Sequence, residues 1–288
     1  METFNHFING EALEPASGVY IDTDNPYTGE VWGQIARGDA ADVDRAVAAA
    51  GDAFHDWKTT SPTSRGKLLV ALAGLIERDA ERLGKIEVRD NGKLIAEMAA
   101  QAAITADWYR YYGGLADKIE GSVIPLDRPG VLNYTKREPL GVVGLITAWN
   151  SPLLLLSWKL AAALAAGNTA VIKPSEFTST STLAFMELFE EAGFPPGVVN
   201  VVTGLGAECG QAIVDHPDVV KIAFTGSDAT GQRIYEAAAK HLKKVTLELG
   251  GKSPNIVFED ADFEAAVMGV ISGIFAATGQ TCIAGSRL

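Results

Sequence analysis

Apolar residues follow two different patterns along this chain. Between residues 39 and 113 the sequence is rich in alanine and typical of helices, whereas from residue 139 short runs of valine, isoleucine and leucine alternate with helical segments. Continuous apolar runs of this kind are typical of strands that are buried on both faces of a parallel sheet. We therefore predict an α/β fold in which helices cover both faces of a parallel sheet.

The pattern also predicts individual elements. Strands and turns are expected before residue 39, and an extended hairpin is expected over residues 121–138. Further strands are expected over residues 141–147, 169–173, 198–203, 219–225, 244–249 and 255–257. A helix is expected to run to about residue 57 with Asp42 as its cap, and others over residues 64–79, 81–91, 93–113, 153–166, 179–192, 208–215, 230–239 and 263–276.

Composition narrows the functional classes. The 288 residues carry 24 Lys+Arg against 36 Asp+Glu, a net charge of −12, and no dense basic cluster, so a nucleic-acid partner is not expected. The longest apolar run, over residues 153–164, is too short to span a bilayer. The two cysteines match neither a zinc signature nor a disulfide framework, so no metal site is expected. Without a signal-peptide pattern, a reducing, cytoplasmic setting is favoured.

Polar residues follow several of the predicted strands, and parallel sheets bind ligands at the carboxyl ends of their strands. Each of these residues also has a structural explanation. Asn150 could donate a hydrogen bond to an oxyanion or cap a helix. Glu248 could be a general base whose pKa is raised by burial, or a carboxylate that faces solvent or a lysine. Cys282, just after Gly279, could be a nucleophile or a buried, inert thiol.

Two further segments could hold a nucleotide. Lys173 and Glu176 could bond a ribose, with the carboxylate favouring a 2′-hydroxyl over a 2′-phosphate, or they could simply cap the next helix. Two glycine loops compete for the phosphates. Residues 204–210 lack the third glycine of the usual dinucleotide fingerprint, and residues 224–231 have only Gly226 and Gly231. The helix that follows either loop could hold an anion at its N-terminus.

The order of these segments is more specific than any one of them. The chain contains WNSPL from residue 149, KPSE from 173, PPGVVNVVTGLG from 195, FTGS from 224, ELGGKSP from 248 and GQTC from 279. In this order they resemble the NAD(P)-dependent aldehyde dehydrogenase superfamily, in its hydrolytic branch. The resemblance implies a Rossmann-like dinucleotide-binding domain over residues 1–120 and 139–250, an oligomerisation hairpin over 121–138, and the truncated start of a catalytic domain over 251–288.

The resemblance also implies catalytic roles. Cys282 would attack an aldehyde to give a thiohemiacetal, while Asn150 and the backbone N–H of Cys282 form the oxyanion hole. Hydride transfer to the nicotinamide would leave a thioester, which Glu248 would hydrolyse by activating water. Glu248 favours a free acid over a CoA ester as the product. Lys159 matches a proton-relay position, and Trp158 and Tyr109 would line the substrate tunnel.

The implied cofactor is NAD, with NADP possible, and the implied substrate is a small aldehyde. Lys173 and Glu176 would bond the adenine-side ribose, and Gly206 and Ala207 would approach the adenine. The other expected cofactor contacts are Ile146, Thr147, Trp149, Ser175, Phe224, Thr225, Gly226, Ser227, Gly231, Leu249 and Gly250. Full-length relatives form homodimers or homotetramers.

Family members continue well beyond the point that corresponds to Leu288. We therefore expect this chain to be the N-terminal portion of an aldehyde-oxidising enzyme, without most of the catalytic domain. One alternative is a non-catalytic dinucleotide-binding module derived from the family. Another is a structural or interaction protein, which decay of the site residues would reveal, and no such decay is visible.

Overall fold

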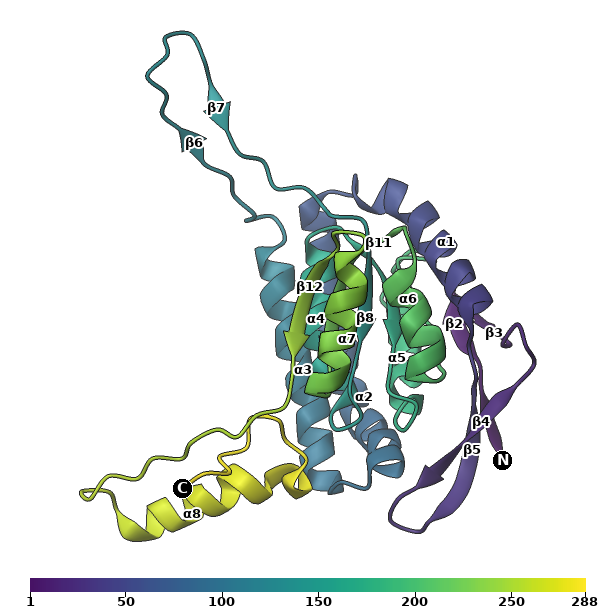
Figure 1. Ribbon diagram of the computed structural model, residues 1–288, viewed down its shortest axis with the longest axis vertical. Helices are drawn as coiled ribbons and strands as arrows, with labels where there is room; N and C mark the ends of the chain where they lie inside the picture. The colour runs from purple at the N-terminus through teal and green to yellow at the C-terminus, as the bar shows by residue number, and fades with distance from the viewer.

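The computed structural model describes all residues from 1 to 288 and is built around a seven-stranded sheet with the order β12-β11-β8-β9-β10-β2-β3 (Figure 1). Its parallel strands are β8 (Val142–Ile146), β9 (Thr169–Lys173), β10 (Val199–Val201), β11 (Val219–Thr225) and β12 (Lys244–Glu248). The antiparallel hairpin of β2 (His6–Ile8) and β3 (Glu11–Leu13) extends the sheet beyond β10.

Successive residues of the central strands belong to two different hydrophobic cores. In β8, Val143 and Leu145 pack in one core, while Val142 and Ile146 pack in the other. This alternation follows from the two-residue period of a strand, whose side chains point to opposite faces. The sheet is therefore buried on both sides, as the continuous apolar runs predict, and that prediction is confirmed.

Helices cover each face of the sheet. The first core contains side chains from α2 (Pro62–Asn91), α3 (Ile95–Leu115), α4 (Pro152–Ala165) and α5 (Thr180–Glu191). The second contains side chains from α1 (Ala40–Trp57), α6 (Gln211–Asp215) and α7 (Asp228–Ala239). None of the helices combines the length and the apolar character that a membrane crossing requires.

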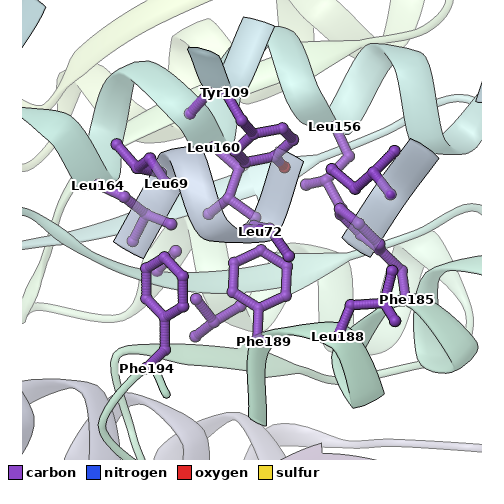
Figure 2. Close-up of a cluster of buried hydrophobic side chains, with 14 of the residues drawn as sticks. Leu69, Leu72, Tyr109, Leu156, Leu160, Leu164, Phe185, Leu188, Phe189 and Phe194 are labelled. Carbon is purple, nitrogen blue, oxygen red and sulfur yellow. The ribbon is translucent and has the colours of Figure 1, made fainter. Parts of the chain in front are cut away.

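Aromatic side chains pack among leucines in the first core (Figure 2). The rings of Phe185 and Phe189 meet edge to face with centroids 5.1 Å apart, and Phe189 continues the contact to Phe194 at 5.0 Å. Tyr109 of α3 lies against both Phe185 and Phe189. Aromatic pairs in this geometry add to the stability gained from apolar burial. These contacts join α3 to α5.

Three segments lie outside this layered body. The sheet of β1 (Glu2–Phe4), β5 (Glu30–Ala36) and β4 (Tyr20–Asn25) flanks it on the N-terminal side. The hairpin of β6 (Val123–Ile124) and β7 (Asn133–Tyr134) projects from one end, as predicted for residues 121–138 (Figure 1). At the other end, α8 (Phe263–Phe275) and the short helix η2 (Ala276–Gly279) extend from the body, and α8 buries none of its residues.

Several local predictions are wrong. The helices expected over residues 64–79 and 81–91 are one continuous helix, α2, because no glycine or proline interrupts the segment between them. Asp39 rather than Asp42 is the N-cap of α1, and the two carboxylates form a capping box in which Asp42 accepts from the N–H of Asp39. Residues 255–257 form no strand, and only an isolated bridge joins Pro254 to Arg287.

The C-terminal end of α2 supplies a buried carboxylate to the start of α5. The N-cap Ser179 makes no side-chain capping bond. Instead, Asp90 of α2 accepts hydrogen bonds from the backbone N–H and the hydroxyl of Thr180, at 3.0 and 2.6 Å. The first turn of a helix has unsatisfied N–H groups and a partial positive charge, so this carboxylate caps α5 across the core.

We predict that Asp90→Ala lowers the free energy of unfolding by about 2–3 kcal/mol, because two buried donors on Thr180 lose their acceptor. Asp90→Asn keeps one acceptor oxygen and is expected to lose less. Urea denaturation followed by circular dichroism measures both changes. Equal stability of Asp90→Ala and the wild type would contradict the capping role.

Candidate active site

A cleft of about 790 Å³ lies at the carboxyl ends of the central strands. The register pairs Ile146 of β8 with both Lys173 of β9 and Phe224 of β11, so these strands end at the same level. The chain continues from β8 to β9 on one side and later returns to β11 on the other. The loops after β8 and β11 therefore diverge and leave a crevice between them, as in other doubly wound sheets.

Nearly all of the residues expected to contact the cofactor line this cleft. These are Ile146, Thr147, Trp149, Lys173, Ser175, Glu176, Gly206, Ala207, Phe224, Thr225, Gly226, Ser227, Leu249 and Gly250. Gly231 does not line the cleft. A Cβ atom there would come within 2.7 Å of Leu249, so this glycine allows α7 to pack closely on the residue that follows β12.

One end of the cleft carries an ion pair. The Lys173 ammonium donates to Glu176 Oε2 at 2.7 Å, and the lysine side chain is almost fully buried. Burial acts to raise the pKa of Glu176, but the Lys173 ammonium and the backbone N–H of Gly206 outweigh it and hold the pKa below its usual value. Glu176 is therefore a negatively charged acceptor at this end of the cleft.

Both glycine loops contribute to the same cleft. Residues Gly206–Gly210 form a turn of π-helix that leads into α6, where the sequence pattern predicts an ordinary helix over residues 208–215. Gly226 lies at the end of β11, and Ser227 is the N-cap of α7, where its hydroxyl accepts from the N–H of Thr230. Both glycine loops therefore line one cleft, and this arrangement is compatible with either loop as the phosphate site.

The other end of the cleft carries the thiol. Cys282 is partly exposed and lines the cleft together with Asn150. The Asn150 side-chain amide donates to the carbonyl oxygen of Gln280 at 2.9 Å. The second cysteine, Cys209, is fully buried, and burial raises the pKa of its thiol to about 11. Cys282 is thus the accessible thiol, while Cys209 is a core residue.

A separate hollow of about 330 Å³ lies beside the edge strand β12, and its lining includes Glu248, Lys159 and Trp158. The Lys159 ammonium donates to the Thr225 hydroxyl at 2.6 Å. Burial lowers the pKa of Lys159, while the negative charges of Glu248 and the Cys282 thiolate act in the opposite direction. Lys159 is therefore near enough to Glu248 and Cys282 for the negative charge of each to act on its pKa.

The structure decides between the two interpretations of Glu248 and corrects the placement of Tyr109. Glu248 is exposed, as in the interpretation that it faces solvent, because β12 is the edge strand of the sheet and pairs only with β11. Tyr109 lines neither hollow. It is fully buried in the aromatic core against Phe185 and Phe189, and burial raises the pKa of its hydroxyl. It is therefore a packing residue in this structure.

Some lining residues were not among the predicted contacts. They are Ala148, Phe177, Gly210, Gln211, Val214, Thr230, Arg233, Ile234, Gly279, Gln280 and Thr281. Thr230, Arg233 and Ile234 share one face of α7, and a helical period counted from Ser227 would have indicated them. Gln280 and Thr281 immediately precede Cys282. Phe177 belongs to an irregular loop, where no period applies.

Comparison with known proteins identifies the family of this chain. The model of the aldehyde dehydrogenase family matches residues 13–288. The chain is 50% identical over 290 residues to a (Z)-2-((N-methylformamido)methylene)-5-hydroxybutyrolactone dehydrogenase from Acinetobacter baylyi, with 100% of this chain and 59% of that protein covered.

Two solved structures are also closely similar to this chain. PnpE from Pseudomonas sp. WBC-3 matches with a TM-score of 0.96 and 52% identity over 100% of this chain and 59% of its own. An NAD⁺ complex of an aldehyde dehydrogenase from Bacillus cereus matches with a TM-score of 0.96 and 47% identity over 99% of this chain and 59% of its own. The chain thus spans about three fifths of the length of these relatives. On sequence and fold, it belongs to the aldehyde dehydrogenase family.

Proposed function

We propose that this chain binds NAD in the cleft and carries the nucleophile and oxyanion donor with which an aldehyde is oxidised to a carboxylic acid. The observation that carries this proposal is the layout of the cleft. An ionised carboxylate beside an ammonium occupies one end, and an accessible thiol beside a side-chain amide occupies the other. This separation suits a dinucleotide that brings its reactive ring to the thiol.

The donors and the space in the cleft fit a dinucleotide. The Thr147 hydroxyl is buried at the cleft wall and has no hydrogen-bond partner within the protein. A Cβ atom at Gly206 would meet nothing within 4 Å, so a flat base can approach the backbone there. The N-terminus of α7 at Ser227 offers free N–H groups to a phosphate. Lys173 and Glu176 would hold the ribose hydroxyls.

The protein groups at the other end suit acyl-transfer chemistry. The Cys282 thiolate would attack the aldehyde carbon and give a thiohemiacetal, whose oxyanion would accept a hydrogen bond from Asn150. NAD, when bound, would accept the hydride that leaves this carbon. The thioester that remains on Cys282 would then be hydrolysed. One N–H of the Asn150 amide donates to the carbonyl of Gln280, and the second N–H is the proposed donor to the oxyanion.

Glu248 is the proposed base for hydrolysis, with Lys159 as a nearby proton carrier. Both line the hollow beside β12, and the negative charges of Glu248 and Cys282 both act to raise the pKa of Lys159 against the effect of burial. The exposed position of Glu248 allows water to reach it directly. The lowered pKa of Lys159 makes it easier for this side chain to give up a proton near neutral pH. Trp158, which lines the same hollow, is a proposed substrate contact.

The division of the chain follows the same proposal. Residues 1–120 and 139–250 form the dinucleotide-binding part, and residues 251–288 begin the catalytic part. The projecting hairpin over residues 121–138 is the proposed contact between subunits, because its strands β6 and β7 pair only with each other. Unpaired strand edges of this kind are available to a partner chain.

We predict that Cys282→Ala abolishes NADH formation from simple aldehydes and leaves NAD affinity within about twofold, because the thiol lies at the far end of the cleft from the ribose site. Absorbance at the NADH band and calorimetry measure the two properties. Turnover that survives in Cys282→Ala would reject this nucleophile. NAD binding without turnover in the full-length protein would instead favour a dinucleotide-binding module.

We expect Glu248→Gln to separate the two halves of the reaction. Hydride transfer does not need the base, so about one equivalent of NADH per Cys282 should form in a rapid burst. Steady-state turnover should then fall by roughly 10²–10⁴-fold, the range usual for loss of a general base. Stopped-flow absorbance resolves the two phases. An unchanged steady-state rate would exclude Glu248 as the base.

Glu176→Gln should weaken the discrimination against NADP. The ionised carboxylate repels a 2′-phosphate, and removing one charge at contact distance should improve the NADP-to-NAD affinity ratio by roughly tenfold. Calorimetric titration with each cofactor measures the ratio. Lys173→Met is the matched control, and it should weaken the binding of both cofactors. An unchanged ratio in Glu176→Gln would show that this carboxylate does not set the selectivity.

A further inference from the structure

The segment that leads to Cys282 has an unusual backbone. Ala277, Thr278 and Gly279 are consecutive residues with φ of 56°, 54° and 73°. Glycine adopts this left-handed region freely, but alanine and threonine do so at a cost, because their Cβ atoms crowd the backbone carbonyl. Such conformations persist only where surrounding groups hold them.

Two side chains hold this turn from outside. Glu97, in the first turn of α3, accepts a hydrogen bond from the backbone N–H of Ala277 through Oε1 at 3.2 Å. Asn150 donates to the carbonyl of Gln280 at 2.9 Å. Inside the turn, the N–H of Gln280 donates to the carbonyl of Ala277 at 3.0 Å. The strained residues therefore lie between a carboxylate on one side and the proposed oxyanion donor on the other.

The segment just before α3 also contacts the loop that carries Asn150. Lys93, between α2 and α3, is buried and donates to the hydroxyl of Ser151 at 3.1 Å. Burial lowers the pKa of Lys93, while the carboxylates of Glu87 and Glu97 raise it. Glu97 therefore lies near the Lys93 ammonium and is held on the long helix α3. From this place it can set the position of the turn relative to the loop after β8.

We propose that Glu97 is a positioning residue for Cys282, which acts by holding the N–H of Ala277 so that the left-handed turn carries the thiol to Asn150. The catalytic part of this inference rests on the proposed function. The geometric part does not, because it concerns only the order of the turn. Glu97 does not touch the reacting atoms, and its loss should disorder the turn without disturbing the ribose end of the cleft.

Two substitutions separate the hydrogen bond from the charge. Glu97→Met has a similar volume but no acceptor for Ala277. Glu97→Gln keeps an acceptor oxygen, and its new NH₂ group replaces Oε2, which is buried without a partner, so no existing bond is broken. Glu97→Ala is a second test of the lost acceptor should Glu97→Met fail to fold. Thermal unfolding followed by circular dichroism verifies that each variant is folded.

The first readout is hydrogen–deuterium exchange in the peptide that covers residues 276–282. In Glu97→Met, backbone exchange there should be roughly tenfold faster than in the wild type, as expected when one charge-assisted hydrogen bond is lost. In Glu97→Gln it should stay within about twofold. The second readout is kinetic: kcat should fall by roughly tenfold or more in Glu97→Met, with the KM for NAD unchanged.

Unchanged exchange and kcat in Glu97→Met would overturn the proposal. An equal loss in Glu97→Gln would overturn it as well, since the charge and not the acceptor would then matter. If the full-length protein forms no NADH from any aldehyde tested, the proposed function fails. The exchange measurement still decides whether Glu97 holds the turn, so the two failures are distinguishable.

Discussion

A parallel sheet that is buried on both faces leaves only the ends of its strands open to a ligand, and the rest of this structure depends on that constraint. Side chains within β8 and β9 are committed to one core or the other. The cleft is therefore formed largely by the loops that follow Ile146, Lys173 and Thr225. After β10 the chain crosses to the other side of β8, where it forms β11. This crossing separates the loop after β8 from the loop after β11 and opens the cleft between them.

The loops are held in turn by buried carboxylates at the end of α2. Asp90 caps α5, and burial raises its pKa to about 6 despite the hydrogen bonds it accepts from Thr180. Glu87 lies one turn earlier in α2. Burial raises its pKa to about 8, although the Lys93 ammonium and the backbone N–H of Leu153, at the start of α4, act to lower it. Burying two acidic groups is costly. Each of them is nevertheless directed at the start of a helix that follows a cleft-lining loop.

The two ends of the cleft differ in how firmly they are built. Lys173 and Glu176 lie between buried strands and a core helix, and their ion pair is largely enclosed. Cys282 follows α8, which buries none of its residues, and a turn with left-handed alanine and threonine. Glu248 stands on an edge strand with an open face. Cofactor binding therefore depends on the core of the fold, whereas the placement of the thiol depends on a few polar contacts.

The sequence by itself determined the α/β class and most strand and helix positions, because apolar periodicity is a local signal. The ordered motifs, through the family that they resemble, also indicated more than half of the residues that line the cleft. Strand β9 and strand β11 begin and end at the predicted residues, 169–173 and 219–225. Only the tertiary structure decided the burial of Tyr109 and the exposure of Glu248, because both follow from which strand lies at the edge and which helices meet across the core. It alone also brought Glu97 to the turn before Cys282, a contact between residues 180 positions apart that no local pattern encodes.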